Sequence, residues 1–254
     1  MRIAVAGGTG LVGRYVVAEL RAAGHQPVVL TRSAGADVLT GDGLDAALDG
    51  ADVLIDVTNT AAVSGRKAAA FFTAGTGNLL AAGRRAGVRH HVVLSIVGTG
   101  RPGMSSGYNA GKVAQEALVR DSGVPFSIMR ATQFHQFVPE LLDRIPGPVL
   151  LVPRMRIQPV AAGEVAAVLA ALAAGPPAGL APEMAGPEPA ELAGLARQVA
   201  QARGSRRPVL RVRVPGAAGR AMAGGGMLPA GPGLRGSQTF GEWLAGSCRS
   251  AQPA

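Results

Sequence analysis

Short apolar runs alternate with stretches of helical spacing along the first half of the chain. The apolar runs predict buried strands at residues 2–6, 26–32, 36–40, 53–57, 91–95 and 125–130. Apolar residues at helical spacing predict helices at 14–23, 45–48, 65–86 and 108–119, the last with Val113, Ala117 and Leu118 on one side. This alternation predicts an α/β fold built on a doubly wound parallel sheet of the Rossmann type.

The second half shows shorter and less regular elements. The pattern predicts strands at 149–153, 157–160 and 209–214 and helices at 162–174 and 188–202. The Gly-, Pro- and Met-rich stretch 215–236 has little periodicity; we interpret it as a surface loop, with a flexible pocket wall as the alternative. We expect one domain, 1–254, with a cofactor-binding core at 1–130 and a small, mainly substrate-binding part at 131–254.

Composition narrows the class of protein. A hydrophobic share of 48% in 254 residues is enough for one globular core, and no apolar stretch has the length of a membrane span. The apolar run at 3–6 is too short for the hydrophobic segment of a signal peptide. Cys248 is the one cysteine, so no intrachain disulfide can form, which suits a cytoplasmic setting.

The net charge of +9 admits an anionic partner. We attribute it instead to an arginine-rich coding bias and a phosphorylated cofactor, because no nucleic-acid-binding motif accompanies it and 4% of the residues are aromatic. No cluster of His, Cys and Asp has metal-ligand spacing, so we expect no metal. We expect a small-molecule substrate, neither nucleic acid nor membrane as a partner, and either a monomer or a homodimer.

A glycine-rich turn connects the first predicted strand to the first predicted helix. Because glycines let the backbone approach a pyrophosphate, which a helix N-terminus stabilises, this context predicts a dinucleotide site. The alternative is a tight turn in a chain with 37 glycines. The cofactor contacts expected here are Gly7, Thr9, Gly10, Leu11, Val12 and Gly13.

The end of the second predicted strand indicates which dinucleotide binds. An NAD site usually has an acidic residue there, whereas this chain has Thr31, Arg32 and Ser33, and its first carboxylate is Asp37. A guanidinium would pair with a 2′-phosphate, so the sequence favours NADP(H). The alternative for Arg32 is a solvated loop residue. Asp42, after the third predicted strand, is placed to approach the adenine.

Candidate catalytic residues come from a Tyr-x-x-x-Lys pair, Tyr108 and Lys112. The chain has two tyrosines and two lysines, and its other basic positions are almost all Arg. Lys is a compact charge that can lose its proton, unlike Arg. A Tyr one helical turn from a Lys can act as an acid/base catalyst.

Several motifs in order resemble the short-chain dehydrogenase/reductase superfamily, and more closely its atypical, NmrA-like branch. They are Gly7-x-x-Gly10-x-x-Gly13, Gly75-Thr76-Gly77-Asn78-Leu79-Leu80, Ser95 located 13 residues before Tyr108, Ala131-Thr132-Gln133-Phe134, and Pro159-Val160 before Glu164-Val165-Ala166. The resemblance covers most of residues 1–175 and more loosely the remainder. Asn78 is expected to serve packing or a backbone hydrogen bond.

The resemblance implies roles for individual residues. Tyr108 would donate a proton to the substrate oxygen, Lys112 would lower the pKa of that tyrosine and hydrogen-bond the nicotinamide ribose, and Ser95 would orient the substrate carbonyl. The bland alternatives are a half-buried residue at the helix start for Tyr108 and a strand-end cap for Ser95. The remaining expected contacts are Thr58, Asn59, Ala131 and Thr132 for the cofactor and Gln133 and Phe134 for the substrate.

One departure leaves the reaction open. The asparagine that completes the family's proton relay would fall near Phe72, which cannot relay protons. The leading function is an NADP(H)-dependent oxidoreductase acting on a carbonyl or quinone-like molecule. The alternatives are a catalytically silent NADP-binding sensor and an isomerase or epimerase. We expect loop 98–107 to be mobile over the site and His135 to be structural.

Overall fold

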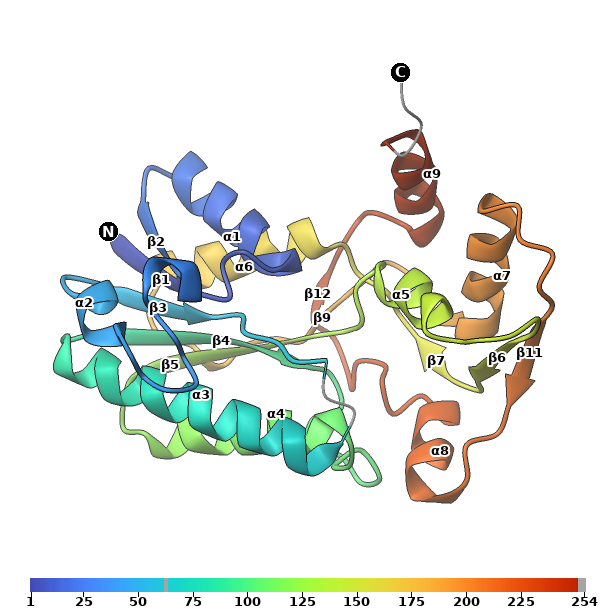
Figure 1. Ribbon diagram of the computed structural model, residues 1–254, viewed down its shortest axis with the longest axis horizontal. Coiled ribbons are helices and arrows are strands. Elements are labelled where there is room, and N and C mark those ends of the chain that lie inside the picture. The colour runs from blue at the N-terminus through green and yellow to red at the C-terminus, as the bar shows by residue number, and fades with distance from the viewer. Residues whose placement is uncertain (62–63, 251–254) are drawn as a thin grey trace. The chain divides into compact units, whose positions relative to one another are not determined.

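The computed structural model describes residues 1–61 and 64–250, and the chain forms two compact units (Figure 1). The first unit comprises Met1–Gly100, Ser105–Arg130 and Ala162–Pro182. The second comprises Arg101–Met104, Ala131–Ala161 and the described part of Glu183–Ala254. Residues 162–182 therefore return to the unit that holds the glycine-rich turn. No helix in the described residues combines the length and the apolar character needed to cross a membrane.

The first unit is built on a sheet of parallel strands. Its order is β2 (Gln26–Leu30), β1 (Arg2–Ala6), β3 (Val53–Asp56), β4 (His90–Ile96) and β5 (Phe126–Ala131), with β8 (Gly179–Leu180) parallel to β5. β1 pairs in parallel with both β2 and β3, so the strand order reverses at β1. The carboxyl ends of β1 and β3 therefore flank the switch point at which such sheets bind ligands. The predicted doubly wound parallel sheet is confirmed.

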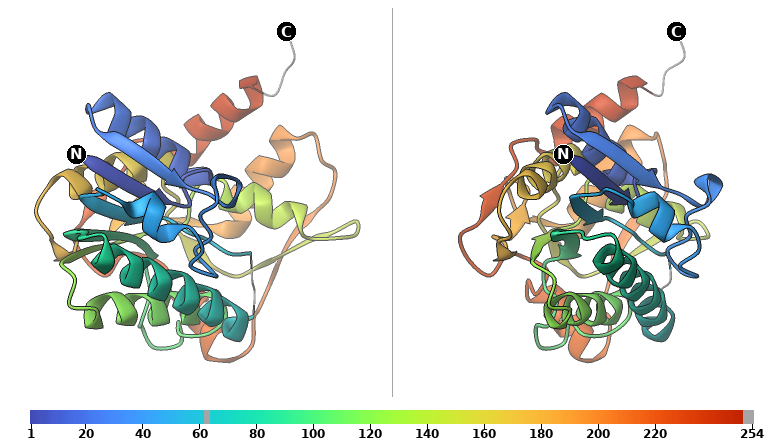
Figure 2. Two further views of the ribbon diagram at one scale, coloured as in Figure 1. Left: turned by 60° about the vertical axis from the view of Figure 1, so that its left-hand side comes forward. Right: turned by 90° about the vertical axis from the view of Figure 1, so that its left-hand side faces the viewer.

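Helices cover both faces of this sheet. α1 (Leu11–Ala22) and α6 (Ala162–Ala174) lie on one face, and α3 (Gly65–Arg85) and α4 (Tyr108–Asp121) lie on the other (Figures 1 and 2). Because both faces are covered, the strands are largely apolar: residues 3–6 of β1 are fully buried. The short α2 (Leu44–Leu48) packs against α3.

The buried side of α4 differs from the expected one. Ala117 is exposed, and Val113 and Leu118 are partly buried. The buried residues are mostly polar, namely Asn109, Gly111, Lys112, Gln115, Glu116 and Val119. Apolar spacing misled the prediction because this helix buries its polar side chains in hydrogen-bonded networks rather than in an apolar core.

Residues 36–40 do not form the predicted strand. Their backbone turns back on itself, as Asp37 N donates to Asp42 O over 2.9 Å and Gly41 N to Asp37 O over 2.9 Å. The side chain of Asn78 on α3 donates to the carbonyls of Val38, over 3.0 Å, and Leu39, over 2.9 Å. These carbonyls are therefore used by a side chain rather than by a neighbouring strand. The expectation of a backbone hydrogen bond for Asn78 is confirmed.

The second unit is built from helices and short pairs of strands. β6 (Leu150–Pro153) pairs in parallel with β11 (Val209–Val212), β9 (Met184–Ala185) in parallel with β12 (Leu234–Arg235), and β7 (Arg156–Ile157) antiparallel with β10 (Ala190–Glu191). The helices are α5 (Phe137–Asp143), α7 (Leu192–Ala202), α8 (Gly216–Ala223) and α9 (Phe240–Ser250). The apolar side of α7 and the inner residues of β6 form its core.

Several boundaries in this unit differ from the prediction. The strand predicted at 157–160 shortens to β7, although Val160 still bridges Phe134. The helix predicted from residue 188 begins at Leu192, after β10. The stretch 215–236, interpreted as a loop, contains α8 and β12, and α9 had no sequence prediction. Small residues conceal α8, since an Ala- and Gly-rich segment has weak apolar periodicity.

We expect Asn78→Ala to destabilise the protein, because the carbonyls of Val38 and Leu39 lose their side-chain donor. Each lost hydrogen bond contributes about 0.5–1.5 kcal/mol, so the free energy of unfolding should fall by about 1–3 kcal/mol. Thr73→Ala, at an exposed position of the same helix, is the matched control and should change it by less than about 0.5 kcal/mol. Urea unfolding measures both, and equal stabilities for the two variants would contradict this role of Asn78.

Candidate functional site

The glycine-rich turn between β1 and α1 leaves no room for side chains. A Cβ on Gly13 would lie 2.1 Å from Gly7 O, and a Cβ on Gly7, where φ is 80°, would lie 2.8 Å from Val57 O. The turn is closed by a 2.9 Å hydrogen bond from Gly10 N to Gly7 O. The glycines are therefore required by the close approach of backbone segments and not merely by local flexibility.

This turn fits the pyrophosphate of a dinucleotide. Gly10 is the N-cap of α1, no side chain caps the helix, and its first turn has no acidic residue. Thr9 and Gly10 are exposed, and Leu11 is partly exposed. The N–H groups at the start of a helix lack partners within it, and with the helix dipole they attract anions. Val12 and Gly13 are buried and support the turn from within.

The end of β2 presents a guanidinium to solvent. Residues Arg32–Ala34 form a single 3-10 turn whose N-cap is Thr31, and Ala34 N donates to Thr31 Oγ1 over 3.2 Å. Ser33 Oγ lies 3.0 Å from the same hydroxyl. Arg32 is exposed, and in the described part of the chain no carboxylate pairs with it. Asp42 is also exposed and accepts a 2.8 Å hydrogen bond from Thr40 Oγ1.

A buried carboxylate lies at the end of β3. Asp56 is fully buried, and one carboxylate oxygen, Oδ1, accepts hydrogen bonds from Thr58 N over 2.9 Å and Thr58 Oγ1 over 2.6 Å. The other, Oδ2, accepts from Gln115 Nε2 over 2.9 Å and Thr76 Oγ1 over 3.2 Å. These four donors satisfy a charge that water cannot reach, as a buried carboxylate requires. Thr58 was expected to contact the cofactor. In this structure its amide and hydroxyl donate to Asp56.

Lys112 directs its ammonium into the protein. It is 3% exposed and donates to Leu94 O over 2.9 Å and to Gln115 Oε1 over 2.8 Å. Its Nζ also lies 4.2 Å from the centroid of the Phe72 ring. Gln115 thus connects the ammonium of Lys112 to the carboxylate of Asp56 through its two amide atoms. Burial lowers the pKa of Lys112 to about 8, although the charges of Asp56 and Glu116 oppose that shift.

Tyr108 is the first residue of α4 and is half-buried. Its hydroxyl donates to Asn59 Oδ1 over 2.8 Å, and its ring packs edge-to-face on Phe72 at 5.6 Å between centroids. Burial, and then the charge of Asp56, raise the pKa of Tyr108. The expected lowering of this pKa by Lys112 is therefore wrong for this structure, because the ammonium is bonded elsewhere. Phe72 packs against both members of the pair.

Ser95 belongs to a second buried network. It is 1% exposed, and its hydroxyl donates to Glu116 Oε1 over 2.6 Å. Glu116 also accepts from Arg130 Nε over 2.9 Å and Arg130 Nη2 over 2.7 Å, and from Arg120 Nη2 over 2.5 Å. The pKa of Glu116 is lowered because these donors outweigh the opposing effect of burial. The donor hydrogen of Ser95 is thus directed at a carboxylate.

The residues expected beside the nicotinamide lie in the second unit. Thr132 is buried, and its amide donates to Met184 O over 2.9 Å and its hydroxyl to Gln158 O over 2.5 Å. Ala131 is likewise buried, whereas Gln133 and Phe134 are partly exposed. The stretch therefore anchors its first two residues within the unit and leaves the next two accessible.

His135 and Arg101 of the loop before α4 are also anchored. The His135 ring is fully buried and stacks on Trp243 at 5.5 Å between centroids, which supports the structural interpretation. Within loop 98–107, Arg101 pairs with Glu183 over 3.0 Å and donates to Leu228 O over 2.5 Å. Arg101 is thus bonded within the second unit, and the mobility of loop 98–107 stays a prediction.

Three functional candidates were missed by the sequence analysis: Asp56, Gln115 and Glu116. Asp56 ends an apolar run, where a carboxylate has to be compensated. Gln115 and Glu116 follow Lys112 at three and four residues, the spacing that places side chains on one face of a helix. That spacing indicates that Gln115 and Glu116 share a helix face with Lys112. The apolar residues of α4 instead predicted a different buried face.

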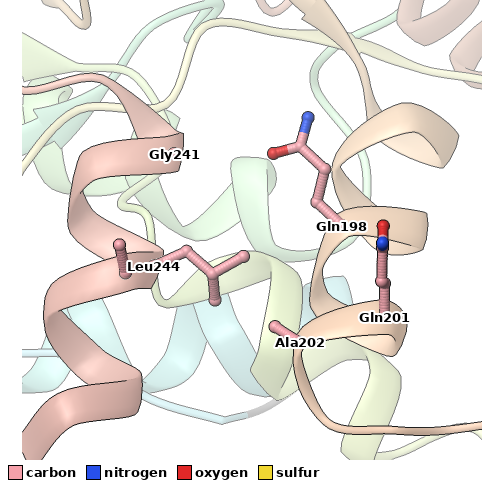
Figure 3. Close-up of a pocket in the computed structure, with 6 residues that line it drawn as sticks. Gln198, Gln201, Ala202, Gly241 and Leu244 are labelled. Carbon is pink, nitrogen blue, oxygen red and sulfur yellow. The ribbon is translucent and has the colours of Figure 1, made fainter.

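Two pockets lie in the second unit. One, of about 360 Å³, lies between α7 and α9 and is lined by Gln198, Gln201, Ala202, Gly241, Leu244 and Ala245. Figure 3 shows Leu244 pointing from α9 toward α7. Its lining has no titratable group, so it offers no acid/base chemistry. The other, of about 220 Å³, is lined by Arg154, Arg211, Val212 and Arg213.

Comparison with known proteins identifies the family. Residues 7–176 match the NAD(P)H-binding family, a span that includes the glycine-rich turn, Tyr108 and Lys112. The chain belongs to this family. The predicted NAD(P)H-binding Rossmann protein is confirmed, by the family match for the cofactor class and by the solved structures for the fold.

A curated relative and two solved structures resemble this chain. A (4-alkanoyl-5-oxo-2,5-dihydrofuran-3-yl)methyl phosphate reductase of Streptomyces griseus subsp. griseus is 35% identical over 144 residues, 52% of this chain and 48% of that protein. The chain thus matches about half the length of this relative. An Escherichia coli NADPH-dependent quinone oxidoreductase complexed with NADPH has a TM-score of 0.73 at 20% identity, covering 96% and 99% of the two chains.

A short-chain dehydrogenase/reductase superfamily protein of Agrobacterium tumefaciens with bound NAD has a TM-score of 0.70 at 22% identity. That likeness covers 98% of this chain and 97% of the other. At these identities the two solved structures show that the fold is shared. The family match, which rests on the sequence, supplies the cofactor class.

We expect Lys112 to titrate near pH 8, because desolvation disfavours its charged form. The chain has two lysines, so NMR of ¹³Cε-labelled lysine gives two signals, and Lys67→Arg leaves only that of Lys112. Between pH 8 and 10.5 the unfolded chain holds this proton while the folded chain has lost it. The free energy of unfolding should therefore rise with pH across that window, by an amount on the order of 3 kcal/mol.

Lys112→Met should remove that component of the pH dependence, which urea unfolding at several pH values measures. A Lys112 signal that titrates at the ordinary value of 10.5 would contradict the buried placement of the ammonium.

Proposed function

We propose that the protein is an NADPH-dependent reductase that reduces a small carbonyl or quinone-like molecule, with Tyr108 as the proton donor. The observation that carries the proposal is the placement of a half-buried, protonated tyrosine hydroxyl at the start of α4, bonded to Asn59 beyond β3. The same unit holds the glycine-rich turn, whose uncapped helix N-terminus suits a pyrophosphate. The proposed proton donor and the proposed dinucleotide-binding turn therefore belong to the same unit.

The cofactor would be held by residues at the carboxyl ends of the strands. The turn at 7–13 would receive the pyrophosphate, and Arg32, with Thr31 and Ser33, would pair with a 2′-phosphate. Asp42, Asn59, Ala131 and Thr132 are the further proposed contacts. When bound, the cofactor would supply a hydride. The exposed, unpaired guanidinium of Arg32 supports NADPH over NADH, because no carboxylate there would repel the phosphate.

Tyr108 would supply the proton that accompanies reduction. Because its pKa is raised, the hydroxyl keeps its proton at neutral pH, as a donor must. A raised pKa also makes it a weaker acid, so the reaction depends on a substrate oxygen whose basicity rises as reduction proceeds. Asn59 Oδ1 accepts the hydroxyl hydrogen and fixes its direction. Asn59 would thus position the donor in addition to contacting the cofactor.

Lys112 would act on this site through charge and packing. Its ammonium lies under the Phe72 ring, on which Tyr108 also packs. In this placement it donates hydrogen bonds to Gln115 Oε1 and to Leu94 O of β4. The proposed ribose contact of Lys112 requires its ammonium to exchange one of these partners for a cofactor hydroxyl.

The curated relative suggests the kind of substrate. By its name it reduces an unsaturated lactone that carries an alkanoyl group and a methyl phosphate group, in which a carbon–carbon double bond is conjugated with carbonyl groups. We propose a conjugated carbonyl compound, of which a quinone is one kind, as the substrate class for this chain. Gln133 and Phe134, the accessible residues of the 131–134 stretch, would supply a hydrogen bond and an apolar wall.

A cofactor-binding sensor is the second candidate, and the placement of Ser95 favours it. A carbonyl-orienting serine has to donate its hydroxyl hydrogen, yet that hydrogen is directed at Glu116 over 2.6 Å. Phe72 also stands where the relay asparagine is expected. Both Ser95 and Phe72 therefore make structural contacts at positions where catalytic groups were expected. A sensor would keep cofactor binding without turnover, whereas an isomerase would bind cofactor without its net consumption.

We expect NADPH to bind more tightly than NADH, and Arg32→Ala to remove most of the difference. A hydrogen bond to a charged group contributes about 1.5–3 kcal/mol, so NADPH affinity should fall by roughly 10- to 150-fold while NADH affinity stays the same. Arg84→Ala, another exposed arginine of the same unit, is the matched control. Calorimetric titration measures the four affinities, and equal binding of both cofactors by the wild type would refute the proposal for Arg32.

We expect Tyr108→Phe to lower turnover by roughly 10²–10⁴-fold while NADPH affinity stays nearly constant. The substitution deletes the hydroxyl and keeps the ring on Phe72. Tyr15→Phe changes the one other tyrosine, which is 41% exposed on α1, and should leave turnover unchanged. NADPH oxidation measured with a panel of enones and quinones provides the readout.

An unchanged rate in Tyr108→Phe would remove the proton-donor role. A wild type that binds NADPH and oxidises it with no member of the panel would favour the sensor.

A further inference from the structure

The positive charge of the protein is concentrated in the second unit. This unit contains 13 of the 25 Lys and Arg residues and 6 of the 16 Asp and Glu residues, a formal charge of +7, against +2 for the first unit. The unit that carries the glycine-rich turn therefore contributes little to the overall charge. A phosphorylated cofactor bound at that turn does not account for the excess, which needs an explanation within the second unit.

Three arginines of this unit gather at one pocket. Arg211 lies on β11 opposite Val152 of β6, Arg213 follows two residues later, and Arg154 follows β6, where its amide donates to Val212 O over 2.8 Å. Together with Val212 these side chains line a pocket of about 220 Å³. The parallel pairing of β6 with β11 thus brings the three side chains together at the carboxyl end of one ribbon.

None of the three guanidinium groups has a partner in the described part of the chain. All three are exposed, and no hydrogen bond or ion pair joins any of them to a carboxylate or carbonyl. Other arginines of the unit are paired, as Arg101 is with Glu183 and Arg203 with Asp143. Three like charges in one pocket repel one another, and a bound anion would relieve that repulsion.

A phosphate group matches this arrangement. A phosphate monoester carries close to two negative charges at neutral pH and three acceptor oxygens, and each guanidinium presents a planar fork of N–H donors suited to such oxygens. The pocket volume of about 220 Å³ is below the roughly 300–1,000 Å³ of pockets for drug-sized ligands. The site therefore suits the phosphate of a small molecule better than a nucleotide.

A polynucleotide fits the same surface less well. Sequence-independent binding of single strands uses aromatic side chains on which bases stack. In the described part of this unit Phe137, Phe240 and Trp243 instead pack against the apolar core. Phe134 is partly exposed, but the pocket lining contains no aromatic residue.

We propose that Arg154, Arg211 and Arg213 form a binding site for the phosphate group of a small organic phosphate. The site is distinct from the residues proposed to hold the cofactor, and the proposal does not rest on the proposed reductase activity.

Calorimetric titration with phenyl phosphate tests the proposal, in the presence of saturating NADP⁺ so that the cofactor's own phosphate contacts are filled. We expect saturable one-to-one binding of phenyl phosphate and none of phenol. The triple variant Arg154→Gln, Arg211→Gln, Arg213→Gln should weaken binding by at least about tenfold. The side chains are exposed, so the variant should fold, which circular dichroism checks.

A charge-matched control removes three other exposed arginines of the same unit that do not line the pocket, Arg144→Gln, Arg197→Gln and Arg206→Gln. It should bind phenyl phosphate within about twofold of the wild type at physiological salt, because distant exposed charges are screened. Inorganic phosphate separates the two sources of this chemistry. Tighter binding of the ester supports an organic ligand, and equal binding assigns the same site to free phosphate.

Three results would overturn the proposal. The first is equal affinity of the pocket variant and the control variant. The second is loss of phenyl phosphate binding in Arg32→Gln, which would place the anion at the cofactor seat. The third is tighter binding of a single-stranded oligonucleotide that depends on the same three arginines. If NADP⁺ does not bind before phenyl phosphate is added, that result counts against the proposed reductase and not against the phosphate site.

Discussion

The site depends on the buried connection from Asp56 through Gln115 to Lys112. Asp56 is fully buried at the carboxyl end of β3, and a buried charge is tolerated only when it is compensated and hydrogen-bonded. Gln115 meets this requirement with one amide atom on the carboxylate and the other on the ammonium. The connection fixes α4 against β3 and β4, and therefore determines where Tyr108 begins the helix and where Phe72 packs.

The polar side of α4 also explains why two neighbouring networks coexist. Gln115 links Lys112 to the carboxylate of Asp56. Glu116, the next residue, accepts hydrogen bonds from Ser95, Arg120 and Arg130. One helix thereby connects to β3, β4 and β5 through hydrogen bonds and ion pairs, in addition to the apolar packing of Val119 with Val93 and Ile128. The glycine-rich turn at 7–13 contains no buried charge that needs compensation. Its glycines are required because neighbouring backbone leaves no room for a Cβ.

The sequence predicted the sheet and the glycine turn well because both depend on local rules. Gly7 and Gly13 have no room for a Cβ, and residues 3–6 of β1, 53–55 of β3 and 92–94 of β4 are apolar and buried. It misplaced what depends on distant partners: residues 36–40 form turns because Asn78 takes their carbonyls. It likewise proposed Ser95 and Lys112 as site residues but could not show that Glu116 and Gln115 engage them. The local sequence there is compatible with several hydrogen-bonding arrangements.

The most direct test of the central claim is deuterium transfer from [4-²H]NADPH to a conjugated carbonyl compound, followed by mass spectrometry and NMR of the product. The account predicts that one deuterium from the cofactor appears on a carbon of the reduced product, and that the second hydrogen comes from solvent. Cofactor binding without deuterium in the product of any enone of a panel, and without NADPH oxidation by any quinone, would contradict the claim that this site reduces its ligand.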